Sequence, residues 1–389
     1  MIGARALRER LSARRGAMVE ELARAVAIDS PTFPPAGANA VASRFAERYR
    51  ALGFEVERLP GARGTGDHML ARLRGRRPEG ARLLLIGHCD TVFPEGEAAR
   101  RPFAVEGDTA RGPGVADMKG SLVACLFAVE ALLEEGFGDF GEILILYDTD
   151  EERGNPSSRP LIEELGRGAS AALIIEPARA SGALVTARKG SIYGKIAVRG
   201  VPAHAGVDPE RGRSAVLELA HQIVRLSGLE RAGGTVNVTG LAGGERPHIV
   251  AGEASCHVEL RAPSQARLDE MEEDLRGLLQ KTFLDGTSLA FERLGGRPAL
   301  ERNAGTDRLL KIAEEVAREA GVPFLHTPTG GGSDGNYLCP LGVPVLDGLG
   351  PVGGNLHTEE EYLELDSLAP RAALLGGMVE RLGATGLSS

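Results

Sequence analysis

Residues 83–94 read LLLIGHCDTVFP, an apolar run that passes directly into polar residues. Leu83–Ile86 predict a buried strand, and His88 and Asp90 follow at its C-terminal end, where open α/β sheets bind ligands. Because residues two apart share one face of a strand, Asp90 can accept a hydrogen bond from the ring of His88 and fix its tautomer. Taken alone, the pair is also compatible with an ordinary polar contact at a strand end. Cys89 should point to the opposite face and pack in the core.

Strand-like and helical segments alternate around this stretch as far as about residue 189. The helix that follows Lys119 carries an apolar stripe, as a helix packed on a sheet requires, and the predicted strands are 54–59, 81–88, 142–149 and 171–176. The pattern returns after about residue 296, with a helix over 309–321 and an apolar run at 343–349. The alternation predicts an α/β domain with a mixed, largely parallel sheet flanked by helices, formed by residues 1–189 and 296–389.

The middle of the chain, residues 190–295, has a different order of elements, β-α-β-β-α-β. Two apolar stripes, one on each predicted helix, would cover one face of a four-stranded sheet: Val216, Leu219, Ile223 and Leu226, then Leu268, Met271, Leu275 and Leu278. We therefore expect an inserted ferredoxin-like α+β domain.

The overall composition limits the class of protein. The chain has 389 residues, 42% of them hydrophobic and 25% charged, which suits two folded domains. Its net charge of −9, with no basic cluster interleaved with aromatics, argues against nucleic acid as a partner, and no apolar run is long enough to cross a membrane. Four scattered cysteines and an N-terminal segment that contains acidic residues fit a cytoplasmic protein better than an exported one.

Four further segments place polar side chains next to apolar runs. Asp117 ends a Gly-rich turn before a helix in GPGVADMKGSL, where an isolated Asp is usually an N-cap. Glu176 follows the apolar run of AALIIEPA, and His357 lies in a turn before an acidic stretch in GGNLHTEEEYLEL. In ILILYDTDEERG, the adjacent Glu151 and Glu152 follow a buried strand, where they repel each other unless a cation compensates them.

Each of these segments has an ordinary explanation, but together they place five imidazole and carboxylate groups near corresponding strand ends, which predicts a metal site. The ligands would be His88, Asp117, Glu152, Glu176 and His357. This mixture favours zinc, with cobalt or manganese as alternatives, over magnesium or calcium.

At this point the chain resembles a family of dinuclear metallopeptidases and amidohydrolases. The family includes glutamate carboxypeptidase, aminoacylase, acetylornithine deacetylase and succinyl-diaminopimelate desuccinylase, and the glutamate carboxypeptidase branch is the most similar. The resemblance spans almost the whole chain and rests on GHCDTVFP, GPGVADMKG, DTDEERG, IIEPA, PAHAG, GGGSDGNYL and NLHTEEEYL, which occur in the family order.

The resemblance implies a role for each residue of the site. One zinc ion would be held by His88 and Glu176 and the other by Glu152 and His357, while Asp117 bridges the two. Asp90 would orient His88, and Glu151 would be the general base that takes a proton from the attacking water and returns it to the leaving nitrogen. A cis peptide between Asp117 and Met118 is also implied.

In the inserted domain, the resemblance implies that His204 of VPAHAG reaches across a dimer interface to help hold the oxyanion, although by residue type alone it is a surface histidine. Asn237 and Arg297 would contact the substrate's free carboxylate, a task that suits the two-pronged guanidinium. Gly331 and its neighbours would let backbone amides approach the substrate, or form only a flexible turn. One departure stands at 245–254, ERPHIVAGEA, which lacks the family's usual Asn and Pro and leaves the substrate open.

These observations predict a hydrolase that cuts an amide bond next to a free carboxylate in a small molecule or short peptide. The leading interpretation is a carboxypeptidase that releases a C-terminal amino acid of the glutamate type and forms a homodimer through the inserted domain. An N-acyl-amino-acid amidohydrolase, an aminoacylase or deacetylase, is the alternative. A non-catalytic binding homologue is the third, and it should have lost the base or a ligand.

Overall fold

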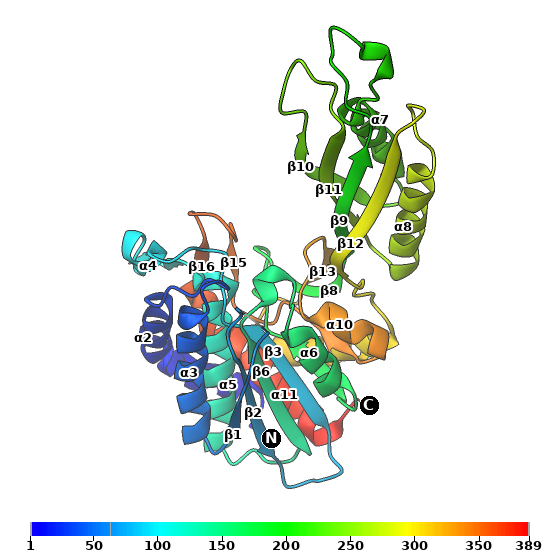
Figure 1. The fold of residues 1–389 in the computed structure, drawn as a ribbon. Coiled ribbons are helices and arrows are strands. Elements are labelled where there is room, and N and C mark those ends of the chain that lie inside the picture. The colour runs from blue at the N-terminus through cyan, green and yellow to red at the C-terminus, as the bar shows by residue number, and fades with distance from the viewer. Residues whose placement is uncertain (1, 63, 388–389) are drawn as a thin grey trace. The chain divides into compact units, whose positions relative to one another are not determined.

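The computed structural model describes residues 2–62 and 64–387 and divides them into two compact units (Figure 1). Unit 1 contains the residues up to Thr186, Arg302–Thr329 and the residues from Ser333 onward. Unit 2 contains Ala187–Glu301 together with Gly330–Gly332. The inserted unit is therefore a few residues longer at each end than the 190–295 expected from sequence. It also includes three glycines that the sequence places in the first domain.

A six-stranded sheet forms the centre of unit 1. Its order is β1 (Glu55–Leu59), β2 (His68–Arg74), β6 (Glu142–Asp148), β3 (Arg82–His88), β7 (Ala171–Ile174) and β14 (Val345–Leu346). β2 runs antiparallel to both of its neighbours, whereas β6, β3, β7 and β14 are mutually parallel. The mixed, largely parallel sheet predicted from the alternating pattern is confirmed, although the sequence reasoning missed β2.

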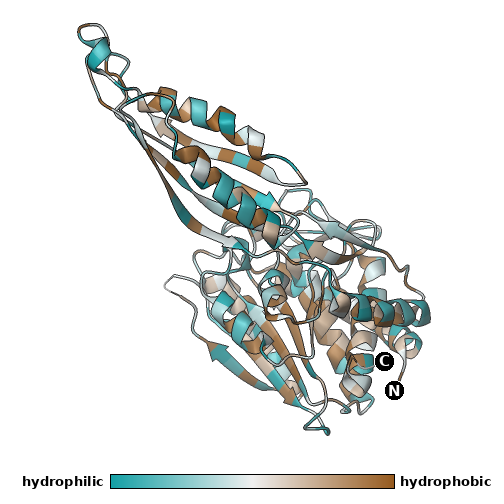
Figure 2. Ribbon diagram, turned by 90° about the vertical axis from the view of Figure 1, so that its right-hand side faces the viewer, coloured by the Kyte–Doolittle hydropathy of each residue, from teal (hydrophilic) through white to brown (hydrophobic). Residues whose placement is uncertain are grey.

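Apolar side chains alternate between two buried faces of this sheet, so both faces are covered by helices. Leu83 and Leu85 belong to the main core, which includes residues of α3 (Ala36–Ala51), α5 (Ser121–Glu134) and α11 (Leu365–Thr385). Leu84 and Ile86 are also fully buried on the other face, where α6 (Ser158–Gly166) and α10 (Gly335–Leu338) lie. Figure 2 shows the strands of this sheet mostly in brown and the outer helices in mixed colours.

The α5 helix is buried nearly all round rather than along one stripe. Besides the sheet, it contacts α1 (Ala4–Ala13), α2 (Arg15–Val26), α3 and α11. The N-terminal segment forms two helices that meet at Arg14, and α9 (Ala304–Ala320) completes the layer with α1 and α11. These helices form a further layer around α5, which explains why the sequence of α5 is apolar on nearly every side of the helix.

A small antiparallel sheet connects the C-terminal segment to the Gly-rich turn before α5. Its order is β15 (Gly353–Gly354), β16 (Tyr362–Glu364), β5 (Thr109–Arg111) and β4 (Ala104–Glu106). The remaining elements of unit 1 are short: α4 (Glu97–Arg100), the π-helical turn η1 (Val115–Gly120), the 3-10 turns η2 (Glu151–Arg153) and η5 (Cys339–Leu341), and the strand β13 (His326–Thr329). The strand β8 (Leu184–Arg188) begins in unit 1 and ends in unit 2. This sheet brings residues that are about 250 positions apart into register.

Unit 2 is an antiparallel sheet with two helices on one face. The sheet order is β10 (Thr235–Gly243), β11 (Glu253–Ala262), β9 (Gly190–Arg199) and β12 (Ser288–Arg297), with α7 (Ala215–Leu226), α8 (Gln265–Leu279) and the short turns η3 (Pro209–Arg211) and η4 (Ser227–Leu229). The predicted ferredoxin-like order is confirmed. Leu219 and Leu226 are buried as expected, but Val216, which we expected in the same apolar stripe of α7, is 42% exposed, and its neighbour Ala215 is buried instead.

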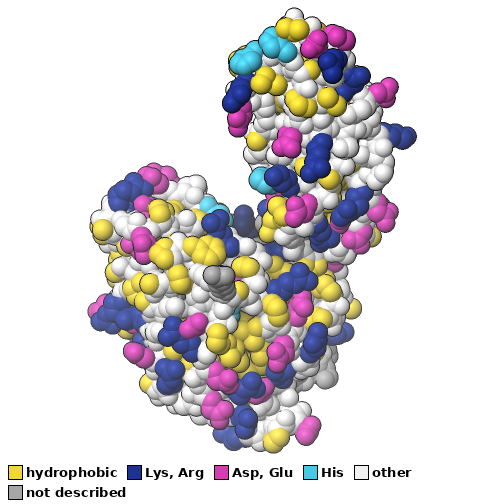
Figure 3. Space-filling view, viewed as in Figure 1, with side chains coloured by type: hydrophobic (Ala, Val, Ile, Leu, Met, Phe, Trp, Pro, Cys, Tyr) yellow, Lys and Arg dark blue, Asp and Glu magenta, His cyan; other side chains and the backbone are white. Residues whose placement is uncertain are grey.

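The surface carries charges of both signs. On the face shown in Figure 3, Lys and Arg side chains are interspersed with Asp and Glu side chains. Within the described ranges, no helix combines the length and the apolar character needed to span a bilayer.

Candidate metal centre

Strand ends of the parallel sheet bring the early site residues to one edge. His88 is the last residue of β3, Glu151 and Glu152 lie in the η2 turn just after β6, and Glu176 follows β7 by two residues. Because β6, β3 and β7 are parallel neighbours, their C-terminal ends meet at the same edge. Cys89 is buried in the core, as its position on the opposite face predicts.

Asp117 reaches this edge from the η1 turn, which leads into α5. The peptide bond between Asp117 and Met118 is cis, as the family resemblance implies. Met118 is buried, and its sulfur accepts a hydrogen bond from the backbone N–H of His88 at 3.1 Å. The turn therefore packs directly against the end of β3.

His357 comes from the far end of the chain, in the loop between β15 and β16. Its backbone has a positive φ of 65°, and its side chain is 54% exposed, whereas the side chains of Asp117 and Glu152 are 9% and 7% exposed. The imidazole thus covers the carboxylates from the solvent side.

The two oxygens of Asp117 face two different imidazoles. Asp117 Oδ1 lies 3.2 Å from His88 Nε2, and Asp117 Oδ2 lies 3.2 Å from His357 Nε2. Glu176 Oε1 is 3.7 Å from His88 Nε2, and Glu152 Oε2 is 3.4 Å from His357 Nε2. One carboxylate therefore stands between two ligand pairs, an arrangement that suits two neighbouring cations.

The donor set also fits a divalent cation electrostatically. Ligand atoms of His88, Asp117 and Glu152 lie within 4.8 Å of one another. Asp117 Oδ1 and Glu152 Oε1 are buried without a hydrogen-bond partner among the described residues. A buried anionic oxygen without a partner is costly unless a cation compensates it. The residues present thus fit a metal site.

Shifted pKa values report the same crowding of charge. Burial, followed by repulsion from Asp117, raises the pKa of Glu152 well above its usual value. Burial opposes the charged form of His88, yet the nearby carboxylates of Asp117 and Asp90 hold its pKa well above the usual value. The carboxylate of Asp117 likewise raises the pKa of His357 against the effect of burial.

Asp90 connects the ligand shell to the proposed base. The ring Nδ1 of His88 is 2.9 Å from the backbone carbonyl of Asp90 and 3.4 Å from its Oδ1, so the carbonyl is a closer partner than the carboxylate that we expected. The carboxylate instead accepts hydrogen bonds from the backbone N–H groups of Glu151 and Glu152, both at 3.3 Å, and from Thr32 Oγ1 at 2.6 Å. Asp90 thereby fixes both the imidazole and the turn that carries Glu151.

The other four predicted site residues lie in unit 2. His204 is exposed, and its Nδ1 accepts hydrogen bonds from the backbone N–H groups of Gly206 and Val207. Arg297 lies beside the glycine segment that contains Gly331. The two pack so closely that a Cβ atom at Gly332 would lie 3.1 Å from the Arg297 side chain.

Asn237 is not close to Arg297 within one chain. The two residues lie on opposite edge strands, β10 and β12, with β11 and β9 between them. Three strand spacings amount to roughly 14 Å. The structure therefore does not bring both side chains of one chain to a single carboxylate.

Sequence reasoning missed two arginines of unit 2. Arg188 Nη1 donates hydrogen bonds to the carbonyls of Gly331 and Gly332 at 3.2 Å, and Arg261 Nη1 donates to the carbonyl of Gly330 at 3.0 Å. Together with Arg297, they place three positively charged side chains around one glycine segment. Arg261 alternates with other polar residues on the open face of β11, so the sequence pattern alone does not distinguish it from a solvated side chain.

A third missed residue, Glu361, lies in unit 1. It is the last of three consecutive glutamates after His357, and it is fully buried. Burial raises the pKa of Glu361 to about 7, although hydrogen bonds from backbone N–H groups favour its charged form.

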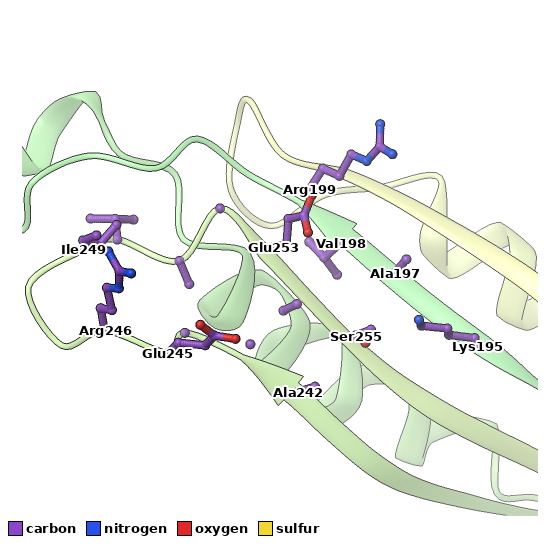
Figure 4. Close-up of a pocket in the computed structure, with 16 residues that line it drawn as sticks. Lys195, Ala197, Val198, Arg199, Ala242, Glu245, Arg246, Ile249, Glu253 and Ser255 are labelled. Carbon is purple, nitrogen blue, oxygen red and sulfur yellow. The ribbon is translucent and has the colours of Figure 1, made fainter.

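A large cavity lies elsewhere, on unit 2. It measures about 600 Å³ and is open to solvent, and its wall is formed by β9, β11 and the segment that follows β10 (Figure 4). Lys195, Arg199 and Glu253 line it, and none of the predicted metal ligands does. Although this cavity is large, it is not the candidate metal site, because none of the predicted ligands lines it.

Comparison with known proteins places the chain in a family. Residues 84–381 match the protein family described as "Peptidase family M20/M25/M40". The chain belongs to this family and is a metal-dependent hydrolase.

Two curated relatives span almost the whole chain. Carboxypeptidase G2 of Pseudomonas sp. (strain RS-16) is 31% identical over 374 residues, which cover 95% of this chain and 90% of that protein. Succinyl-diaminopimelate desuccinylase of Alkalilimnicola ehrlichii is 30% identical over 357 residues, which cover 87% and 92%. Among solved structures, aminopeptidase PepT from Bacillus cereus has a TM-score of 0.78 at 22% identity, covering 95% of this chain and 98% of that one, and this likeness shows the fold.

Proposed function

We propose that the chain is a carboxypeptidase that uses two zinc ions to release a C-terminal amino acid of the glutamate type. The observation that carries the proposal is the position of Asp117, with each carboxylate oxygen 3.2 Å from a different imidazole nitrogen. The 31% identity to carboxypeptidase G2 supports the choice of reaction.

Each ion would have its own pair of ligands besides the shared Asp117. His88 and Glu176 hold one ion, and Glu152 and His357 hold the other. Imidazole and carboxylate together favour zinc, while cobalt and manganese accept the same ligands. Metal analysis of the purified protein, followed by reloading with each metal, would identify the native ion.

The residues around the ions would divide the chemistry. Bound divalent cations polarise the amide carbonyl and make water a stronger acid. Glu151 accepts a proton from the attacking water and then donates it to the leaving nitrogen. Its charge acts on both Glu152 and His357, which supports its position beside the ligands. Asp90 holds the backbone of Glu151 in place.

His204 would stabilise the developing negative charge on the carbonyl oxygen. Two backbone N–H groups donate to its Nδ1, so the ring proton of the neutral imidazole must be on Nε2. That leaves Nε2–H as a directed donor, as an oxyanion hole requires.

Substitution of the proposed base tests the mechanism. In Glu151→Gln, we expect kcat to fall by about 10²- to 10⁴-fold, with metal content unchanged because Glu151 is not one of the five ligands. Glu95→Gln, an exposed glutamate of unit 1, is the matched control. Unchanged turnover in Glu151→Gln would refute the mechanism. A wild-type protein that turns over no substrate would favour the non-catalytic alternative, against which the presence of the base and all five ligands weighs.

The free carboxylate of the substrate would be recognised in unit 2. Arg297 supplies a two-pronged donor, Arg188 and Arg261 add positive charge around Gly331, and the glycines expose backbone amides. These groups suit a substrate with a free carboxylate but do not by themselves distinguish a peptide from an N-acyl amino acid.

A second candidate function, N-acyl-amino-acid amidohydrolase, is favoured by the 30% identity to the desuccinylase. A substrate panel assayed by amine release separates the two. We expect peptides that end in glutamate to show kcat/KM values about 10-fold or more above those of N-acyl amino acids, N-succinyl diamino acids included. The reverse order would establish the second candidate.

We further propose that unit 2 acts as a lid and joins two copies into a homodimer, with His204 and Asn237 supplied to the partner's site. Within one chain, Asn237 is too far from Arg297 to contact the same substrate carboxylate. In the dimer, Asn237 would contact the carboxylate in the partner's site.

Subunit mixing tests this arrangement. Neither Glu151→Gln nor His204→Ala alone should be active, but their mixed dimer contains one site with both wild-type residues. Equal mixing followed by exchange should restore about a quarter of wild-type activity. No recovery in verified mixed dimers would place His204 in its own chain's site.

We keep the cytoplasm as the proposed location. All four cysteines, Cys89, Cys125, Cys256 and Cys339, are outside disulfides, which suits a reducing compartment.

A further inference from the structure

Three consecutive glutamates follow the metal-ligand segment that carries His357, and they differ sharply in environment. The side chains of Glu359 and Glu360 are 65% and 77% exposed, whereas Glu361 is 0% exposed. A buried carboxylate is costly unless it is well hydrogen-bonded. The contacts of Glu361 therefore indicate what the residue is for.

Both oxygens of Glu361 accept hydrogen bonds from the turn that carries Asp117. Oε1 is 2.9 Å from the backbone nitrogens of Ala116 and Asp117, and Oε2 is 2.9 Å from the backbone nitrogen of Gly114. Gly114 has a φ of 71°, and a Cβ there would lie 2.5 Å from the side chain of Thr91, so only glycine fits this turn. One carboxylate thus anchors three donors of a single turn.

A buried cation lies in the same turn. Lys119, from the same turn, is buried and donates hydrogen bonds from Nζ to the carbonyls of Ile28 at 2.7 Å and Pro113 at 3.3 Å. Its charge interacts with that of Glu361. Charge-assisted hydrogen bonds of this kind are stronger than neutral ones.

Glu361 also belongs to the segment that carries His357. The loop 355–361 is closed at its base, where Gly353 and Gly354 of β15 pair with Leu363 and Tyr362 of β16. The same carboxylate therefore joins the loop of one ligand to the turn of another. The orientation of that turn decides where the two oxygens of Asp117 lie.

We propose that Glu361 is a positioning residue of the metal centre. It holds Asp117 in the bridging position, and this allows the ion held by Glu152 and His357 to bind. The inference rests on the proposed dinuclear site. Glu361 itself touches neither ion nor substrate.

A metal titration distinguishes this role from a structural one. Metal-free wild-type, Glu361→Gln and Glu360→Gln proteins are titrated with Zn²⁺ at pH 8 by calorimetry, and bound metal is counted after desalting. Gln keeps one carbonyl oxygen for the N–H groups of Ala116 and Asp117 but places an amide against the N–H of Gly114. Glu360→Gln removes the same charge from an exposed neighbour and is the matched control.

In Glu361→Gln, we expect the affinity for the second ion to fall by about 10- to 100-fold, while the affinity for the first stays within about threefold of wild type. Glu360→Gln should bind both ions as wild type does. Wild-type binding of both ions by Glu361→Gln would overturn the proposal. If the wild type itself bound fewer than two ions, the proposed function would fail, and that outcome is distinct because it needs no variant.

Glu361→Asp keeps the charge but withdraws the carboxylate, so it should also weaken the second ion. Circular dichroism of the metal-free proteins checks that each variant folds. If neither variant folded, Glu361 would be required for the fold rather than for the metal, and the proposal would be rejected.

Discussion

Asp117 places its two carboxylate oxygens between two imidazoles that come from residues 88 and 357 of the chain. No local pattern connects these positions, yet each residue type could be recognised. His88 and Glu176 follow apolar strands, and the ends of parallel strands meet. Glu361, in contrast, could not be separated from its two exposed neighbours, because its burial depends on hydrogen bonds to residues about 245 positions away.

His68 gives a test of electrostatics at the scale of a single residue. It is 2% exposed in β2, and its Nε2 lies 2.9 Å from Ser157 Oγ. Burial lowers the pKa of His68 below the usual 6.5, although the carboxylates of Asp150, Asp90 and Asp67 oppose the shift. As the pH falls below about 6.5, the unfolded chain therefore binds a proton before the folded chain does, and stability decreases.

We expect His68→Gln to lose less stability than the wild type between pH 7.5 and pH 5.5. Urea unfolding of the metal-free proteins measures the difference, and His326→Gln, at an exposed position of unit 1, is the control. Equal losses in His68→Gln and wild type would contradict the lowered pKa.

At the scale of elements, segments were recognised where apolar residues form a continuous run, as in the strand over 82–88, or recur with the helical period, as in the two helices of unit 2. β2 was missed because its buried half, His68–Ala71, includes a polar histidine and its outer half is basic. The inclusion of Gly330–Gly332 in unit 2 has no sequence signal, since glycines carry no side-chain pattern.

The central position of α5 predicts a large cost for a cavity there. Leu126 is 0% exposed, so Leu126→Ala should lower the free energy of unfolding by about 2–5 kcal/mol. Leu325→Ala, at a position that is 48% exposed, should cost less than about 1 kcal/mol. Denaturant unfolding of the metal-free proteins compares them, and equal losses would show that α5 is not at the core.

At the scale of the whole molecule, the sequence predicts two domains and the family, while the arrangement of the substrate groups depends on the three-dimensional structure. Arg188, Arg261 and Arg297 come from three strands and meet only because the glycine segment returns to unit 2. The placement of Asn237 on the opposite edge strand is the reason why we propose that it binds substrate in the partner's site.

Anomalous X-ray scattering at the zinc edge, from crystals of the zinc-loaded protein, tests the proposed dinuclear centre most directly. We predict two peaks about 3.5–4 Å apart, one beside His88 and Glu176, one beside Glu152 and His357, with Asp117 between them. A single peak, or peaks that lie away from Asp117, would contradict the dinuclear site.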